Sequence, residues 1–383
     1  MRILHTSDWH LGRSFHQVGL LPAQQLFIDH LVDQVAEREV DAVLVAGDVY
    51  DRALPGPQTV EVLDDALARI VAAGAQVVLT SGNHDSAVRL GFGSRLMEAS
   101  GVHLRTGVDD MLRPVEVDGA RIYALPYLEP SVAAPLLGED VAASHLGVLG
   151  EALRRVAADA ERFDGPVVVS AHAFVTGAVE SESERDISVG GIGDVPASLF
   201  EGFDYAALGH IHGRQEIRPH VRYSGSPVAM SFSEQAHTKS SWLVELPPQR
   251  GGALHVEAVE APVLRPLATL RGDLLDLLAD PVHEHAEEAW CRVILTDDAR
   301  PLDAMNQLRQ RFPYTVVLEH QPAHVSPTAQ HSYASRVRTA SDAELVDGFL
   351  THVRRGRGPD ERERAVVAEA IEQSRIERAE AVR

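Results

Sequence analysis

Side chains that can bind a metal follow five apolar segments of this chain. They are Asp8 and His10 in SDWH, Asp48 in AGDVYD, Asn83 and His84 in GNHD, His172 in SAHAF, and His210 and His212 in LGHIHG. Carboxylate, imidazole and amide groups without a thiolate favour Mn, Fe, Zn or Mg. Leaving His84 aside, seven ligands are too many for one four-coordinate site. They suit two divalent ions, with Asp48 as the bridging carboxylate.

The chemistry that such a set predicts is hydrolysis at phosphorus. Two ions a few Å apart can clamp a phosphate, lower the pKa of a water and steady the attacking and leaving oxygens. His84 follows the ligand Asn83 directly but points elsewhere along the turn. Beside a phosphate, it could protonate the leaving oxygen or stabilise the charge that develops there.

These side chains must be brought together by the strands that precede them. Helical patterns over 26–40, 59–74, 91–101 and 149–163 alternate with short apolar strands, which predicts a layered α/β fold with helices on both faces. In such folds the carboxyl ends of the strands face a common crevice. In extended chain, residues two apart point the same way, so Asp8 with His10 and His210 with His212 can each face one cavity.

The rest of the chain is predicted to form two further parts. A boundary near the APVLRPL stretch separates residues 1–262 from a small mixed α/β unit over 263–330. Helices follow over 338–383, where Ser341 and Glu344 form a capping box before the apolar stripe Leu345, Val346, Phe349, Leu350 and Val353. The stripe either packs on its own domain or binds a partner. The acidic segment VESESERD is expected to be a solvated loop.

Composition limits the possible functions. One cysteine, Cys291, excludes a disulfide framework, and the N-terminus is no secretory signal, so a cytoplasmic location is predicted. No apolar run reaches the roughly 20 residues that span a bilayer, which predicts no membrane partner. The net charge of −21 argues against a nucleic acid partner. Bound cations or a basic partner subunit could offset it.

The order D-x-H, G-D, G-N-H-D, H and G-H-x-H resembles the calcineurin-like metallophosphoesterases over about residues 1–235. The segments ILHTSDWHLGRSF, AGDVYDRALP, SGNHDSAVRL, SESERDISVG and ALGHIHGRQ are similar to the bacterial SbcD family of nuclease subunits. This resemblance implies two sheets flanked by helices, a small α/β capping domain and a C-terminal helical tail.

The resemblance also implies roles for the individual residues. One metal would be held by Asp8, His10, Asp48 and His212, and the other by Asp48, Asn83, His172 and His210. His84 would be the catalytic histidine, and Mn²⁺ the preferred ion, with Mg²⁺ possible. Archaeal and eukaryotic relatives carry a histidine where this chain has Asp51, so a second catalytic histidine is not expected here.

The same family acts on DNA as an exonuclease and endonuclease in repair, recombination and replication. The resemblance therefore implies DNA as substrate, a homodimer through helices around 58–74 and 88–100, and docking of the C-terminal helices on an SbcC-type coiled-coil ATPase. The chain has no G-x-x-x-x-G-K-[ST] pattern, so any dependence on ATP must come from another chain.

Two other functions stay open at this point. A metallophosphoesterase for a small phosphodiester or phosphomonoester agrees better with the net charge of −21. The extra domain and the tail argue against it, because a small substrate needs neither. A non-catalytic scaffold that only binds a partner is disfavoured by the intact ligand set.

Overall fold

The computed structural model describes residues 1–185, 187, 193–322, 341–353 and 358–381. The chain forms two compact units, one of residues 1–294 with 303–319 and one of residues 295–302 with 320–383. The domain boundaries after residue 262 and before residue 338 stay predictions. Within the described residues, no helix is long and apolar enough to cross a membrane.

The first of two six-stranded sheets is built from the apolar segments near the N-terminus. Its order is β16 (His255–Glu260), β15 (Ser240–Glu245), β1 (Arg2–Thr6), β4 (Ala42–Ala46), β5 (Gln76–Thr80) and β6 (Val102–Arg105). Strands β1, β4, β5 and β6 run parallel to one another, and β15 pairs antiparallel with both β1 and β16.

The second sheet contains the strands that lead to His172, His210 and His212. Its order is β13 (Gln215–Arg218), β14 (Val221–Tyr223), β12 (Tyr205–Gly209), β9 (Val167–His172), β8 (Ala120–Ala124) and β7 (Val115–Val117). Its four central strands are parallel, so β9 and β12 end at the same edge. His172 is the last residue of β9, and His210 directly follows β12.

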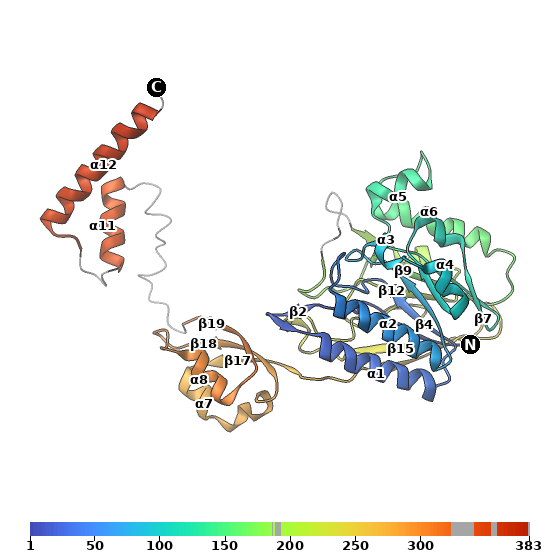
Figure 1. Ribbon diagram of the computed structural model, residues 1–383. Helices are drawn as coiled ribbons and strands as arrows, with labels where there is room; N and C mark the ends of the chain where they lie inside the picture. Colours follow the sequence, from blue (N-terminus) through green and yellow to red (C-terminus); the bar gives the residue numbers. More distant parts are fainter. Residues whose placement is uncertain (186, 188–192, 323–340, 354–357, 382–383) are drawn as a thin grey trace. The chain divides into compact units, whose positions relative to one another are not determined.

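Helices cover the outer face of each sheet, as Figure 1 shows. The first sheet carries α1 (Leu21–Glu37) and α2 (Pro57–Ala72), and the second carries α5 (Pro130–Leu137) and α6 (His145–Asp159). Alternate residues of a strand face opposite layers: Val43 and Val45 pack toward the helices, whereas Ala42 and Leu44 pack between the sheets. The prediction of two sheets flanked by helices is confirmed.

The predicted helix over 91–101 is interrupted. The chain forms α3 (Ala87–Leu90), α4 (Ser94–Met97) and a 3-10 turn over Glu98–Ser100. Gly91 ends α3, and Gly93 adopts a left-handed backbone with φ of 76°. Glycine adopts the left-handed conformation without steric cost. Gly91 and Gly93 therefore interrupt the single helix that the apolar spacing predicts.

The C-terminal third contains a small sheet with helices beside it, followed by a helical tail. A three-stranded sheet of order β17 (Leu267–Gly272), β18 (Trp290–Leu295) and β19 (Thr315–His320) is accompanied by α7 (Leu274–Ala279) and α8 (Ala304–Arg311). The tail contains α11 (Asp342–Val353) and α12 (Glu361–Ala381). The capping box is confirmed: the Ser341 backbone N–H donates to the Glu344 carboxylate (2.7 Å), and the Glu344 N–H to the Ser341 hydroxyl (3.4 Å).

A close approach of the two sheets at Gly209 yields a prediction about stability. A Cβ atom on Gly209 would lie 1.7 Å from the carbonyl oxygen of Ala46, which is backbone and cannot rotate away. We expect Gly209→Ala to lower the free energy of unfolding by about 3 kcal/mol through overpacking. Urea unfolding of the metal-free protein measures the change.

Gly19→Ala is the matched control, because a Cβ atom at Gly19 meets no atom within 4 Å. It should change the free energy of unfolding by no more than about 0.5 kcal/mol. Equal unfolding midpoints for the two variants would contradict close packing between β4 and β12.

Candidate metal centre

The predicted ligands lie where strands β1, β4, β5, β9 and β12 end. Four of them leave their strands in backbone conformations that side-chain-bearing residues rarely adopt, with φ of 53° at Asp8, 43° at His10, 47° at Asp48 and 105° at His210. Hydrogen bonds hold the first two turns together, from the Asp8 N–H to the Gly47 carbonyl (3.1 Å) and from the His10 N–H to the Asp48 carbonyl (2.9 Å). Such backbone strain concentrates at functional sites.

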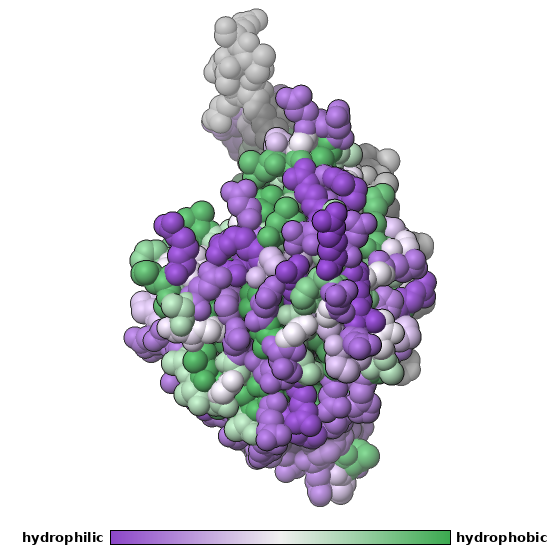
Figure 2. Space-filling view, turned by 90° about the vertical axis from the view of Figure 1, so that its right-hand side faces the viewer, coloured by the Kyte–Doolittle hydropathy of each residue, from purple (hydrophilic) through white to green (hydrophobic). Residues whose placement is uncertain are grey.

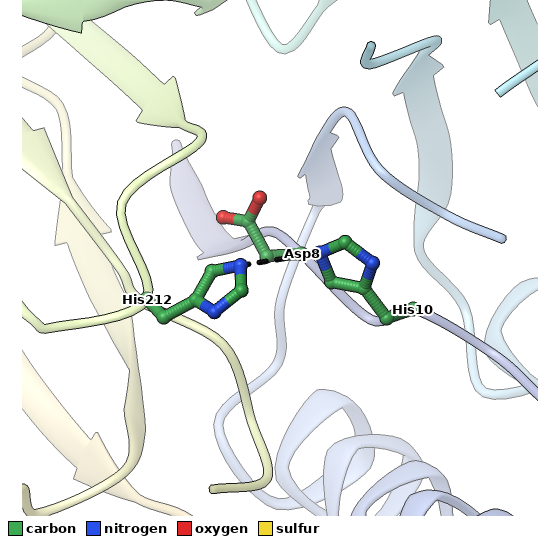
Figure 3. Close-up of side chains that lie close together, drawn as sticks. All are labelled: Asp8, His10 and His212. Carbon is green, nitrogen blue, oxygen red and sulfur yellow. Dashed lines mark hydrogen bonds between the residues drawn. The ribbon is translucent and has the colours of Figure 1, made fainter. Parts of the chain in front are cut away.

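Six side chains form three overlapping groups, and in each group the possible ligand atoms lie within 4.8 Å of one another. The groups are Asp8, His10 and His212; His10, Asp48 and His84; and Asp8, Asp48 and His172. Figure 3 shows His10 and His212 facing each other through nitrogen, with their Nε2 atoms 3.2 Å apart. The Oδ2 atom of Asp48 lies 3.5 Å from the Nε2 atoms of both His10 and His172. Asp48 thus stands between two groups of ligands.

The other two predicted ligands lie beside His172. The Asn83 side-chain oxygen is 2.9 Å from His172 Nε2. The His210 ring lies 5.3 Å from the His172 ring, centroid to centroid, and its backbone N–H donates to both oxygens of Asp8 (3.0 and 3.1 Å). His210 belongs to none of the three close groups. The structure therefore brings all seven predicted ligands to one centre, with His210 at its margin.

His84 is half-buried at the same centre. Its backbone N–H donates to Asp48 Oδ1 (2.8 Å), and its Nδ1 is 2.9 Å from the carbonyl oxygen of Asp51. A carbonyl can only accept, so Nδ1 carries a proton and the neutral ring keeps its lone pair on Nε2. Burial lowers the pKa of His84 and outweighs the opposing charge of Asp48.

Two carboxylates of the centre are buried and lie near each other. Burial, together with the charge of Asp48, raises the pKa of Asp8 to about 7. Burial would also raise the pKa of Asp48, but the charge of His172 and a hydrogen bond from it hold that pKa far below its usual range. Burial would lower the pKa of His172, yet Asp48 and Asp8 outweigh it and raise the pKa to about 9.

The donor set fits two cations. His172 Nδ1 lies 3.0 Å from the Ala46 carbonyl, so a neutral His172 directs its Nε2 lone pair at the oxygens of Asn83 and Asp48. The Nε2 atoms of His10 and His212 also face each other, 3.2 Å apart. Within the described parts of the chain, the buried Nε2 of His210 also has no hydrogen-bond partner. A cation at each cluster would satisfy these lone pairs.

Sequence patterns did not reveal the groups that hold the ligands in place. Asp85 accepts from the backbone N–H groups of Val49 (3.0 Å), Tyr50 (2.9 Å) and Gly82 (2.9 Å), and thereby fastens the turn after β4 to the turn after β5. Asp85 is part of the GNHD motif, but nothing in the motif distinguishes an anchor from a ligand. On α1, the buried Gln24 donates to the carbonyl of His10 (2.7 Å).

The expectation of a solvated loop for VESESERD is wrong at two positions. The Ser183 hydroxyl lies 2.6 Å from His212 Nδ1, and Glu184 accepts from the His212 backbone N–H (2.8 Å). Arg13 adds a third contact by donating to the Ser183 carbonyl (3.2 Å). Part of this acidic segment therefore packs directly behind the centre.

Comparison with known families agrees with this geometry. Residues 1–214, more than half of the chain, match the calcineurin-like phosphoesterase family model, and the chain belongs to that family. The family implies a metal-dependent phosphoester hydrolase. Residues 263–354 match the SbcD_C family model, described as the type 5 capsule protein repressor C-terminal domain.

Two solved structures illustrate the similarity. TT1561 of Thermus thermophilus is 14% identical, with 67% of this chain and 98% of that chain covered and a TM-score of 0.40. A dimetal phosphatase from Danio rerio is also 14% identical, with 68% and 96% covered and a TM-score of 0.40.

The raised pKa of His172 predicts that metal binding releases protons. The metal-free ring is charged below about pH 9, whereas a ligand must be neutral. We expect the apparent Mn²⁺ affinity to rise about tenfold per pH unit between pH 7 and pH 9 and then to level off, since one proton is displaced. Calorimetric titration in two buffers of different ionisation enthalpy counts the protons directly. An affinity that is flat over this range would show that His172 is already neutral.

Proposed function

We propose that this chain is a two-metal DNA phosphodiesterase, the nuclease subunit of an SbcCD-type complex. It would act with its partner as an ATP-dependent double-strand exonuclease and as an endonuclease on single strands and hairpins, in DNA repair and recombination. One observation carries the proposal: the seven predicted ligands and His84 lie close together in a chain whose residues 263–354 match the SbcD_C family model.

In the proposed centre, each ligand has a definite place. Asp8, His10, Asp48 and His212 would hold one ion, and Asp48, Asn83, His172 and His210 the other. When bound, the two ions, Mn²⁺ or else Mg²⁺, supply positive charge for the phosphate and activate a water. Asp48 suits the shared position, because the same oxygen faces His10 and His172.

His84 would act on the leaving group. Its Nδ1 is fixed by the Asp51 carbonyl, so only Nε2 can exchange a proton with a substrate. Its pKa is lowered in the free protein, but a phosphodiester anion bound alongside would raise it. Nε2 could then hold the proton that the departing sugar oxygen needs.

The C-terminal helices would provide the partner contact. Phe349 on α11 is 53% exposed and Val366 on α12 is 65% exposed, so both helices offer apolar side chains to another surface. We propose that residues 338–383 dock on the coiled-coil base of an SbcC-type ATPase, and that residues 263–330 form the capping domain. ATP hydrolysis by the partner would then open access to duplex DNA.

A specific observation favours a second candidate. The net charge of −21 suits a small phosphodiester or phosphomonoester better than a polyanion. The arginines near the centre support the larger substrate: Arg52 is 80% exposed beside Asp51, and Arg89 donates to the nearby Ala53 carbonyl (3.2 Å). A non-catalytic scaffold would need neither these residues nor His84.

Substitution of His84 tests the proposed reaction. We expect His84→Ala to slow Mn²⁺-dependent cleavage of linear and hairpin DNA by about 10²–10⁴-fold, because proton transfer to the leaving oxygen is lost. Gel assays with and without the ATPase partner and ATP measure the rates. His255→Ala, at an exposed position of β16, is the matched control and should cleave at the wild-type rate.

The same assays on a cyclic nucleotide separate the candidates. Hydrolysis of the nucleotide without cleavage of any DNA would overturn the DNA assignment and leave the two-metal centre standing. Equal DNA cleavage by wild type and His84→Ala would remove the catalytic role of His84.

An apolar surface on α3, α4 and the turn between them supports the proposed homodimer. Val88 and Phe92 are each 86% exposed, and Leu96 is 82% exposed. Figure 2 shows how hydrophobic residues interrupt the otherwise hydrophilic surface on the side that faces right in Figure 1. Side chains this exposed gain most from burial against another protein surface. A second copy of the chain is the proposed occupant.

Charged substitutions test the dimer. Phe92→Glu combined with Leu96→Glu should convert the dimer to a monomer in analytical ultracentrifugation, because four carboxylates would be buried at a twofold interface. The control combines Val132→Glu and Leu136→Glu on α5, which are 60% and 65% exposed, and should stay dimeric. Loss of the dimer in the control alone would place the interface on α5 instead.

A further inference from the structure

A buried polar network lies behind His212, on the side of the ring away from His10. We infer that Ser183 and Glu234 are positioning residues that fix the tautomer and orientation of His212, so that its Nε2 is presented to a metal ion. This inference rests on the proposed metal centre and adds to it a dependence on two residues outside the ligand set. Neither residue touches the substrate in this account, and both act through His212.

Counting hydrogens determines the direction of each hydrogen bond. The Ser183 hydroxyl lies 2.5 Å from Glu234 Oε1 and 2.6 Å from His212 Nδ1. A carboxylate only accepts, so the single hydroxyl hydrogen is donated to Glu234. Ser183 must then accept from His212, which places the ring proton on Nδ1. Nε2, 3.2 Å from His10 Nε2, is left with its lone pair.

Lys239 keeps Glu234 in the acceptor state. Glu234 is 1% exposed and Lys239 is 6% exposed, and the two form an ion pair. The ammonium also donates to the His212 carbonyl (2.9 Å) and to the Ser226 hydroxyl (3.0 Å), so all three of its hydrogens have acceptors. A buried charge pair of this kind is stable only when it is fully hydrogen-bonded. Lys239 is the only lysine of the chain, and it serves this network.

The backbone of His212 is held by the same surroundings. Glu184 Oε1 accepts from its N–H (2.8 Å), while its carbonyl accepts from Lys239 and from the Ser226 N–H (3.1 Å). The ring and the peptide groups on both sides are therefore fixed together. Such outer hydrogen bonds set the direction and basicity of a metal-binding imidazole.

His212 differs here from two other imidazoles of the centre. His172 and His84 each place Nδ1 against a backbone carbonyl, of Ala46 (3.0 Å) and Asp51 (2.9 Å). A carbonyl partner survives any side-chain substitution, whereas the partner of His212 is a hydroxyl that a single substitution removes. This makes the role of Ser183 open to a clean test.

The test compares Mn²⁺ binding by three variants of the full chain, measured by the electron paramagnetic resonance signal of free Mn²⁺. Ser183→Ala removes the acceptor, and we expect it to weaken one of two Mn²⁺ sites by about 10–100-fold. Ser183→Thr keeps a hydroxyl and should restore affinity to within about threefold of wild type, since Thr offers the same donor and acceptor.

Ser233→Ala is the matched control. The Ser233 hydroxyl accepts from the Glu182 backbone N–H (3.0 Å), so it holds the same segment of chain without contacting His212. It should bind Mn²⁺ like the wild type. Thermal unfolding in EDTA should give the same midpoint for all three variants, which separates an effect on the metal from an effect on folding.

The outcomes are distinct. Weaker binding in Ser183→Ala alone, with recovery in Ser183→Thr, supports the inference. Equal losses in Ser183→Ala and Ser233→Ala would overturn it, because docking of the segment would then explain both, and so would unchanged binding in Ser183→Ala. A wild-type chain that binds no Mn²⁺ would overturn the proposed metal centre itself and the inference with it.

Discussion

The hydrogen bond between His172 Nδ1 and the carbonyl oxygen of Ala46, at 3.0 Å, is the interaction on which the centre depends. It joins the end of β9 in one sheet to the end of β4 in the other. The approach is possible because Gly47 has no side chain: a Cβ atom there would lie 2.4 Å from His172 Nδ1. With Nδ1 occupied in this way, Nε2 is turned toward Asn83 and Asp48, and ligands from two sheets meet.

That approach also places negative charge where water cannot reach it. Asp8 is completely buried and Asp48 is 2% exposed, and isolated carboxylates in such surroundings are strongly destabilised. In the metal-free protein, the positive charge of His172 offsets the negative charge of Asp48. The raised pKa of Asp8 lets that carboxyl group take up a proton and lose its charge. Bound divalent ions would take over the role of both the charged His172 and the proton on Asp8. The fold thus buries two carboxylates whose negative charge a pair of cations would neutralise.

The sequence was sufficient for the elements whose pattern is local. Apolar strands that end in Asp, Asn or His indicated the layered fold and the residues that meet at the strand ends, and Ser341 with Glu344 indicated the start of α11. The break at Gly91 and Gly93 was missed, because apolar spacing outweighed two glycines. Ser183 and Glu234 were missed for a different reason. Ser183 contacts His212 across 29 positions, and Glu234 accepts from Ser183 across 51 positions, so only the tertiary fold makes these hydrogen bonds.

The acidic composition and the proposed DNA substrate are compatible once charge is considered locally. Exposed charges more than about 8–10 Å apart are largely screened at physiological ionic strength, so the net charge says little about the potential at one rim. Asp8 and Asp48 would be neutralised by the ions that they bind, and Glu234 is paired with Lys239. Many remaining carboxylates face arginines of their own, as Glu98 faces Arg105 and Arg113. Phosphates that approach the centre would therefore meet two cations and exposed arginine rather than the average surface of the chain.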